Sequence, residues 1–109
     1  MRPSMDDRTI AMTTQLQRTV TVFHKQGLHA RPAALFVKIA SKFSSTITVK
    51  KGRKSVDGKS IMGLLTLAAH GGSRVSIVVN GPDAHEALEQ LCRLLTEPLP
   101  ELPNVTSAS

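Results

Sequence analysis

The chain contains one cysteine, no tryptophan and no tyrosine. Cys92 alone excludes an internal disulfide, and without companions at ligand spacing it excludes a cysteine-anchored zinc site. No segment approaches the ~18 consecutive apolar residues of a membrane span, and the N-terminus has no apolar core followed by a cleavage site. We therefore expect a cytoplasmic protein without membrane attachment.

Aromatic and acidic residues are also scarce. Phe23, Phe36 and Phe43 are the only aromatics, which argues against a nucleic-acid partner because such proteins stack bases on aromatic side chains. The 14 Lys and Arg outnumber the 8 Asp and Glu, giving a formal net charge of +6. The excess of positive charge falls within residues 15–96. By charge alone, this folded part favours an anionic partner, which is an acidic protein surface, a phosphate or a nucleic acid.

The length of 109 residues, with 40% hydrophobic and 20% charged residues, is typical of one folded domain. Residues 1–14 are polar without periodicity and are expected to form a flexible N-terminal extension. The prolines that follow Thr96 cannot continue a helix, because each lacks an amide donor and clashes with the preceding turn. We therefore expect a domain over 15–96 and a flexible Pro-rich tail over 97–109.

Two hydrophobic periodicities alternate within the domain. Apolar residues at every second position predict strands, and apolar residues at steps of three and four predict helices. The expected order is strand 18–23, helix 30–43, strand 46–50, a turn at 51–54 into a short strand through Val56, a short helix over 60–68, strand 75–79 and helix 84–95. Because each element has one apolar face, we predict an α+β domain with all helices on one side of a four-stranded sheet.

The polarity of the strands predicts which sheet face meets water. Their outward positions are hydroxyl-bearing residues that can stay solvated, namely Thr19, Thr21, Thr46, Thr48 and Ser76. Two helix starts carry cap signals. Ser60 is a preferred N-cap residue, and Asp83 with Glu86 three positions later resembles a capping box.

Chemistry concentrates in the segment between the first strand and the first helix. Gly27 allows a sharp turn, and Pro32 is tolerated only in a first helical turn, so the helix must begin close to His29. The His29 imidazole then lies where unpaired helix amides and the Arg31 guanidinium favour an anion. The same positive field disfavours imidazolium and favours a neutral ring that can attack phosphorus. A cap or surface histidine is the simpler alternative for His29 alone, but the glycine, arginine and proline around it indicate a phosphate site.

The sequence GLHARPA over residues 27–33 resembles the active-site signature of HPr, the histidine-containing phosphocarrier of the bacterial phosphoenolpyruvate-dependent sugar phosphotransferase system. The sequence KSIMGLL over residues 59–65 resembles the second HPr signature, around a regulatory serine. The similarity extends from about Leu16 to Leu95 and preserves the spacing between the two motifs. It implies an open-faced β-sandwich, with a four-stranded antiparallel sheet and three helices on one face.

The resemblance also implies roles for individual residues. His29 would take a phosphoryl group on Nδ1 from enzyme I and give it to a sugar-specific EIIA domain, and Arg31 would steady that group. Ser60 would be the target of an HPr kinase/phosphorylase and so would control binding to a transcriptional regulator. The chain would be a monomeric, stoichiometric carrier rather than a true catalyst, and it would need no cofactor and no metal.

Rapid exchange of partners favours a small, partly apolar docking surface of the transient class, below ~1,200 Å². We expect it on the first helix, at Ala34 and Lys38, and on the short helix that the resemblance places beside the active site, at Ile61, Met62 and Leu65. For Ile61 and Leu65 a place in the core is an equal alternative, whereas Met62 suits an exposed, adaptable contact.

The remaining polar residues suggest no further site. His24, His70 and His85 have no acidic residue or cysteine at ligand spacing and are expected to be solvated, and Cys92 is expected to pack in a helix. The basic residues Lys50, Lys51, Arg53 and Lys54 are expected to form a solvated hairpin that attracts acidic partners.

Two other functions stay open. An HPr-like regulator in a carbon- or nitrogen-control phosphorelay would use the same His29 chemistry, so the residues discriminate poorly between it and a sugar-system carrier. A basic nucleic-acid-binding module would instead show steep salt dependence that survives loss of His29.

Overall fold

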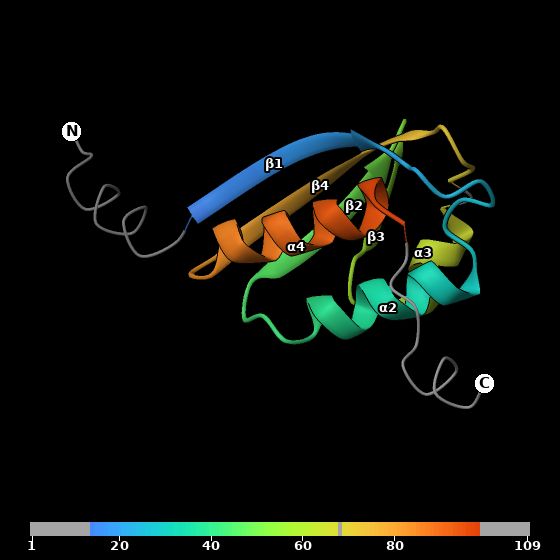
Figure 1. Ribbon diagram of the computed structural model, residues 1–109. Helices are drawn as coiled ribbons and strands as arrows, with labels where there is room; N and C mark the ends of the chain where they lie inside the picture. Colours follow the sequence, from blue (N-terminus) through green and yellow to red (C-terminus); the bar gives the residue numbers. More distant parts are fainter. Residues whose placement is uncertain (1–13, 68, 99–109) are drawn as a thin grey trace, which may run out of the picture.

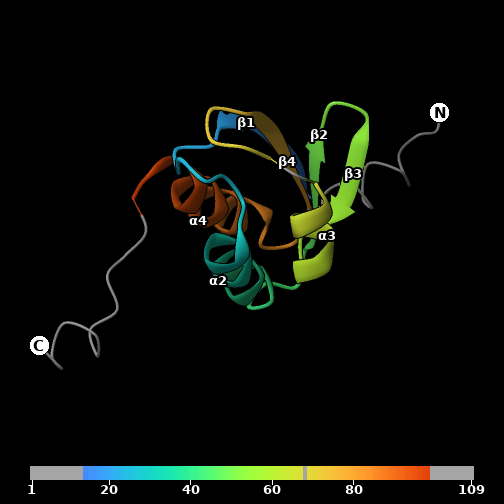
Figure 2. The ribbon, with the colours of Figure 1, turned by 90° about the vertical axis from the view of Figure 1, so that its right-hand side faces the viewer.

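The structure is a computed structural model, and it describes residues 14–67 and 69–98. In chain order the elements are β1 (Thr14–Thr21), α2 (Ala30–Ala40), β2 (Thr46–Lys51), β3 (Lys54–Asp57), α3 (Ile61–Thr66), β4 (Arg74–Gly81) and α4 (Ala84–Thr96) (Figure 1). Every strand pairing is antiparallel, and the sheet order is β1-β4-β2-β3. The three helices cover one face of this sheet (Figure 2). The predicted α+β open-faced sandwich is therefore confirmed.

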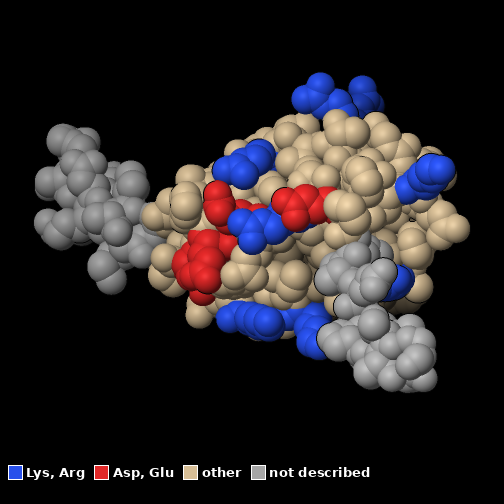
Figure 3. Space-filling model, viewed as in Figure 1, with Lys and Arg blue, Asp and Glu red and all other residues tan. Residues whose placement is uncertain are grey.

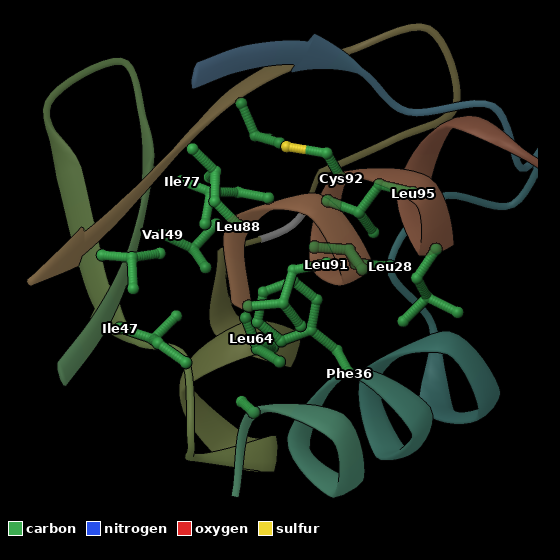
Figure 4. Close-up of a cluster of buried hydrophobic side chains, with 14 of the residues drawn as sticks. Leu28, Phe36, Ile47, Val49, Leu64, Ile77, Leu88, Leu91, Cys92 and Leu95 are labelled. Carbon is green, nitrogen blue, oxygen red and sulfur yellow. The ribbon is translucent and has the colours of Figure 1, made fainter. Parts of the chain in front are cut away.

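The core lies between the helices and the inward face of the sheet. Alternate residues of β2 and β4 point into it, as their periodicity predicted, and the helices supply Phe36, Leu64 and Leu91, which are fully buried. Figure 4 shows these side chains together with Leu28, which reaches the core from the segment before α2. Each such side chain stabilises the fold by ~1.5–3 kcal/mol relative to exposure.

The opposite face of the sheet is polar, as predicted. Thr19 and Thr21 are exposed, and the hydroxyls of Thr19 and Ser76 form a hydrogen bond of 2.7 Å across β1 and β4. This pairing leaves the hydroxyl face open to solvent while the helices occupy the other side. Within the described part of the chain, no helix is both long and apolar enough to cross a lipid bilayer.

Several predicted boundaries were wrong. β1 begins at Thr14, the last residue of the predicted extension, rather than at Arg18. Its first residues pair with β4, and Leu16 packs against the core, although Arg18 interrupts the alternation between Leu16 and Val20. β1 ends at Thr21, although Val22 stays buried and bonds to the segment before β4. Residues 1–13 and 99–109, which hold most of the two predicted tails, lie outside the described residues.

The first helix ends three residues before the predicted position. α2 stops at Ala40 because the amides of Lys42 and Phe43 each bond three residues back, which tightens the chain into turns. Phe43 nevertheless packs against the core from this turn. The short helix α3 spans six residues from Ile61, within the predicted 60–68, of which residue 68 is not described.

The predicted capping box at Asp83 was also wrong. Asp83 is the N-cap residue of α4, but its side chain makes no cap hydrogen bond. Its carboxylate instead accepts hydrogen bonds from the Ser44 amide at 2.9 Å and from the amide and hydroxyl of Ser45. These bonds hold the pKa of the Asp83 carboxyl below its usual range, with the Ser45 hydroxyl as the largest cause. Asp83 therefore links α4 to the turn before β2.

Candidate functional site

The segment that leads into the predicted site is tied to the C-terminal end of α4. The Phe23 amide donates to the Leu95 carbonyl at 2.7 Å, and His24 Nε2 donates to the Leu94 carbonyl at 2.9 Å. The last-turn carbonyls of a helix have no partner inside it, so these bonds satisfy two of them. His24 is buried, with 9% of its surface exposed, so the predicted solvated histidine was wrong at this position. His70 and His85 are exposed, as predicted.

Gly27 holds the next part of the segment against residues 69–71. Its φ of +74° is in the left-handed region that favours glycine. A Cβ here would collide with the Ala69 carbonyl oxygen and would lie 2.7 Å from the His70 Cα. The neighbouring Leu28 amide donates to the same Ala69 carbonyl at 2.8 Å, and the Leu28 side chain is buried. The backbone before His29 is therefore fixed on two sides.

His29 is the N-cap residue of α2, in the place that the glycine and proline predicted. Its backbone is extended, and its carbonyl accepts the first helical hydrogen bond from the Ala33 amide at 3.0 Å. Its side chain makes no cap hydrogen bond and is partly buried. The buried Pro32, third in the helix, contributes no amide. The imidazole is thus held at a positive helix end without being used as a cap.

His29 lines an open depression of about 550 Å³. The other lining residues come from the segment before α2 and from the end of α4, namely Phe23, His24, Lys25, Gln26 and Pro98. None of these six residues is acidic, so the walls of the depression place no competing negative charge beside an incoming anion.

Basic residues precede and follow His29 in the sequence, at Lys25 and Arg31. Arg31 is exposed in the first turn of α2, two residues after His29. The chain has no Asp or Glu from Arg8 to Val56, a stretch that includes β1, α2 and β2. Acidic side chains gather over α4 instead (Figure 3). A phosphoryl group on His29 would meet helix amides and an arginine, which suits its charge.

The second predicted motif begins α3, which packs beside α2 (Figure 2). Ser60 is its N-cap, as predicted, and its hydroxyl accepts a hydrogen bond from the Gly63 amide at 3.0 Å. Ile61, Met62 and Leu65 are 42%, 69% and 37% exposed. They are therefore surface residues rather than core residues, and we refer to these three as the α3 patch.

The two predicted docking residues of α2, Ala34 and Lys38, are exposed as well. Lys54, predicted to be solvated on the hairpin, is exposed but donates from Nζ to the Thr66 carbonyl at the end of α3, at 2.9 Å. This lysine therefore helps to terminate α3, a role for which the local sequence gives no signal.

Sequence reasoning missed His24 and Phe23 as parts of the site. Phe23 is 55% exposed and lies in the depression beside His29. The sequence did contain a signal for Phe23, because it lies on the outward side of an alternating segment, six residues before His29. The burial of His24 had no local signal, because its partner is 70 positions away.

Comparison with known proteins shows the family of this chain. Residues 16–97 match the family model described as "PTS HPr component phosphorylation site". The chain belongs to the HPr phosphocarrier family. It is 46% identical over 82 residues to the HPr-like protein Crh of Bacillus subtilis, covering 75% of this chain and 96% of Crh. It is 42% identical over 80 residues to the phosphocarrier protein HPr of Cupriavidus necator, covering 73% and 90% of the two chains.

Solved HPr structures share the fold. A crystal structure of HPr from Bacillus anthracis superposes with a TM-score of 0.73 at 46% identity, covering 75% of this chain and 98% of that one. A crystal structure of B. subtilis Crh, described as a domain-swapped, intertwined dimer, has a TM-score of 0.63 at 44% identity and covers 79% and 99%. The family identity places this HPr-type chain among the components of the phosphotransferase system and fits a link to carbon catabolite regulation.

Proposed function

We propose that His29 accepts a phosphoryl group from phosphoenolpyruvate-charged enzyme I and passes it to the EIIA domain of a sugar permease. The observation that carries the proposal is the His29 imidazole at the start of α2, with no cap hydrogen bond, in an open depression. A ring with its lone pair available in that position can reach a phosphoryl group presented by another protein. The proposal also includes a cytoplasmic location, where the donor and acceptor proteins would meet the carrier.

In the proposed transfer, the Nδ1 lone pair of His29 attacks phosphorus in line with the leaving group. The new P–N bond forms as the P–N bond of the donor's phosphohistidine breaks, and that bond's electron pair stays with the donor ring. The first-turn amides of α2 and the Arg31 guanidinium stabilise the charge on the phosphoryl oxygens. Because phosphoryl transfer depends mainly on positioning and charge stabilisation, the fixed backbone before His29 is the contribution of the fold.

The test is incubation of the full chain with radiolabelled phosphoenolpyruvate and enzyme I. We expect a phosphate that is labile in acid and stable in alkali, as phosphohistidine is. The His29→Ala variant should take up no label, and Arg31→Ala should take it up more slowly. His85→Ala is the matched control, because His85 is exposed on α4 away from the depression. Label that persists in His29→Ala would refute the proposal.

We also propose that phosphorylation of Ser60 by an HPr kinase/phosphorylase regulates docking and binding to a transcriptional regulator. Ser60 directly precedes the exposed Ile61 and Met62, so a phosphate there adds negative charge at the edge of the α3 patch. Incubation with ATP and such a kinase should label the protein. Ser60→Ala should abolish the labelling, whereas Ser55→Ala, an exposed serine on β3, should retain it.

A purely regulatory carrier is the second candidate function, favoured by the 46% identity to Crh. The two functions differ in whether EIIA domains receive label from phosphorylated His29. We propose a monomer that exchanges partners quickly, and sedimentation at micromolar concentration tests that state against dimers of the kind described for Crh.

A further inference from the structure

Phe23 is the exposed aromatic side chain that lies beside the proposed phosphoryl acceptor. It is 55% exposed, and it lines the same depression as His29. Large apolar side chains are common on protein surfaces when isolated, so exposure alone assigns no role. Because Phe23 and His29 line the same depression, Phe23 is part of the surface that a phosphoryl donor or acceptor must approach.

The backbone and ring of Phe23 are held in place. Its amide is bonded to the Leu95 carbonyl at 2.7 Å. Its ring meets the His24 ring edge to face, with the centroids 5.8 Å apart and an angle of 85° between the planes. His24 is in turn buried and bonded to Leu94. A side chain ordered before binding loses little conformational entropy in a complex, which is typical of an interface anchor.

The depression and the α3 patch flank the same helix end. α2 contacts α4 on one side and α3 on the other (Figure 2). Phe23 and Pro98 belong to the α4 side, and the α3 patch belongs to the other side. A partner whose reactive group is seated on His29 is therefore positioned to contact both sides.

We propose that Phe23 and Lys25 form a second docking element on the α4 side of His29, which receives an apolar side chain flanked by a carboxylate on the protein that exchanges phosphoryl groups with His29. This inference rests on the function proposed above. It extends the docking surface beyond the residues of α2 and α3 to the segment before α2.

The charge of Lys25 and the position of this element next to His29 favour an apolar side chain flanked by a carboxylate as the group that binds here. Lys25 is exposed and lines the depression, so its charge attracts a partner carboxylate. No lining residue is acidic, and the carboxylate of Glu97, next to the lining Pro98, lies 4.0 Å from Arg93. Phe23 and Lys25 line the same depression as His29, so a protein that reaches His29 also comes close to these two residues. Among the described residues, Phe23 is the one aromatic among the large exposed hydrophobic side chains, which is too few for a nucleic-acid strand that stacks successive bases.

The experiment measures steady-state phosphoryl transfer from enzyme I to the full chain, with KM and kcat obtained separately. We expect Phe23→Ser to raise KM about tenfold with kcat within about twofold of wild type, because truncating an interface anchor weakens binding without moving the reacting atoms. Phe23→Leu, which keeps an apolar side chain, should recover most of the loss. Lys25→Glu should raise KM at low salt, and the difference should shrink as salt screens the charge.

Two controls distinguish a loss of docking from a loss of stability and from a general effect of net charge on KM. Arg53→Glu makes the same charge reversal at the exposed turn between β2 and β3 and should change KM less than Lys25→Glu. Thermal unfolding should move little in Phe23→Ser, because that ring is half exposed. If Phe23→Ser is unstable, Lys25→Glu still decides the outcome.

Each outcome has a distinct meaning. An unlabelled wild-type protein overturns the proposed function, and this inference with it. A labelled wild type whose KM is unchanged in Phe23→Ser and Lys25→Glu overturns the docking element alone. A dimer that becomes monomeric in Phe23→Ser would assign the surface to a second copy of the chain and would also overturn it.

Discussion

Substitution of Gly27 by alanine tests whether close backbone packing holds the proposed phosphoryl site in position. Two effects act at this residue. Its φ of +74° is left-handed, which costs an L-residue ~1–2 kcal/mol. The added Cβ also collides with the Ala69 carbonyl and the His70 Cα, both of which are backbone and cannot rotate away. Enforced overpacking of this kind typically costs ~1–3 kcal/mol.

Gly52 provides a matched control for the conformational part. Its φ is +60°, and a Cβ built there meets nothing within 4 Å. Gly52→Ala therefore carries the left-handed cost, less ~0.4–1 kcal/mol regained because alanine restricts the unfolded chain. Gly27→Ala carries the same two contributions plus the collision. The difference in unfolding free energy between the two variants isolates the collision, and we expect ~1–3 kcal/mol.

The assay combines urea unfolding with the rate of labelling from phosphoenolpyruvate and enzyme I. Relief of the collision must move residues 27–28 away from Ala69, and His29 follows directly in the chain. A displacement of ~1 Å at a reacting group can cost up to ~100-fold in rate. We expect Gly27→Ala to lose at least tenfold in labelling rate while Gly52→Ala stays within about twofold of wild type. Equal stability and equal rates in the two alanine variants would refute the reasoning.

Two further predictions concern other side-chain hydrogen bonds. The lowered pKa of Asp83 stabilises the fold above the unfolded-state pKa of about 3.9, and this contribution is lost as pH falls through the folded pKa. The melting temperature of the wild type should therefore approach that of Asp83→Asn as the pH is lowered from 6 to 2.5, and a constant difference would contradict the assignment. Ser60→Ala removes the acceptor of the Gly63 amide and should lower the unfolding free energy by ~1 kcal/mol in urea, with Ser55→Ala near zero as the control.

The parts of the fold that depend on local patterning were predictable. Apolar residues at every second position predicted the buried residues of β2 and β4, and apolar residues at steps of three and four predicted the helices α2 and α4. Both patterns arise because each element buries only one face. The position of His29 was predictable for the same kind of reason. A glycine two residues before it and a proline three residues after it permit a helix start at only a few positions.

Long-range hydrogen bonds and contacts could not be predicted. Asp83 and Glu86 have the spacing of a capping box. The Asp83 carboxylate instead accepts hydrogen bonds from the amides of Ser44 and Ser45, about 38 positions away. His24 likewise has a partner 70 positions along the chain. No local pattern encodes these partners, because tertiary packing decides which donors and acceptors meet.

His29 and Ser60 are both N-cap residues, but they use their side chains in opposite ways. Ser60 accepts the Gly63 amide, so a phosphate on its hydroxyl must replace that acceptor at the start of a six-residue helix. The His29 ring makes no cap bond, and its backbone is held instead by contacts of Gly27 and Leu28 with the segment that begins at Ala69. A phosphoryl group can therefore join and leave His29 without breaking a hydrogen bond that begins α2. This difference agrees with the proposed roles, repeated phosphoryl transfer at His29 and a slower regulatory change at Ser60.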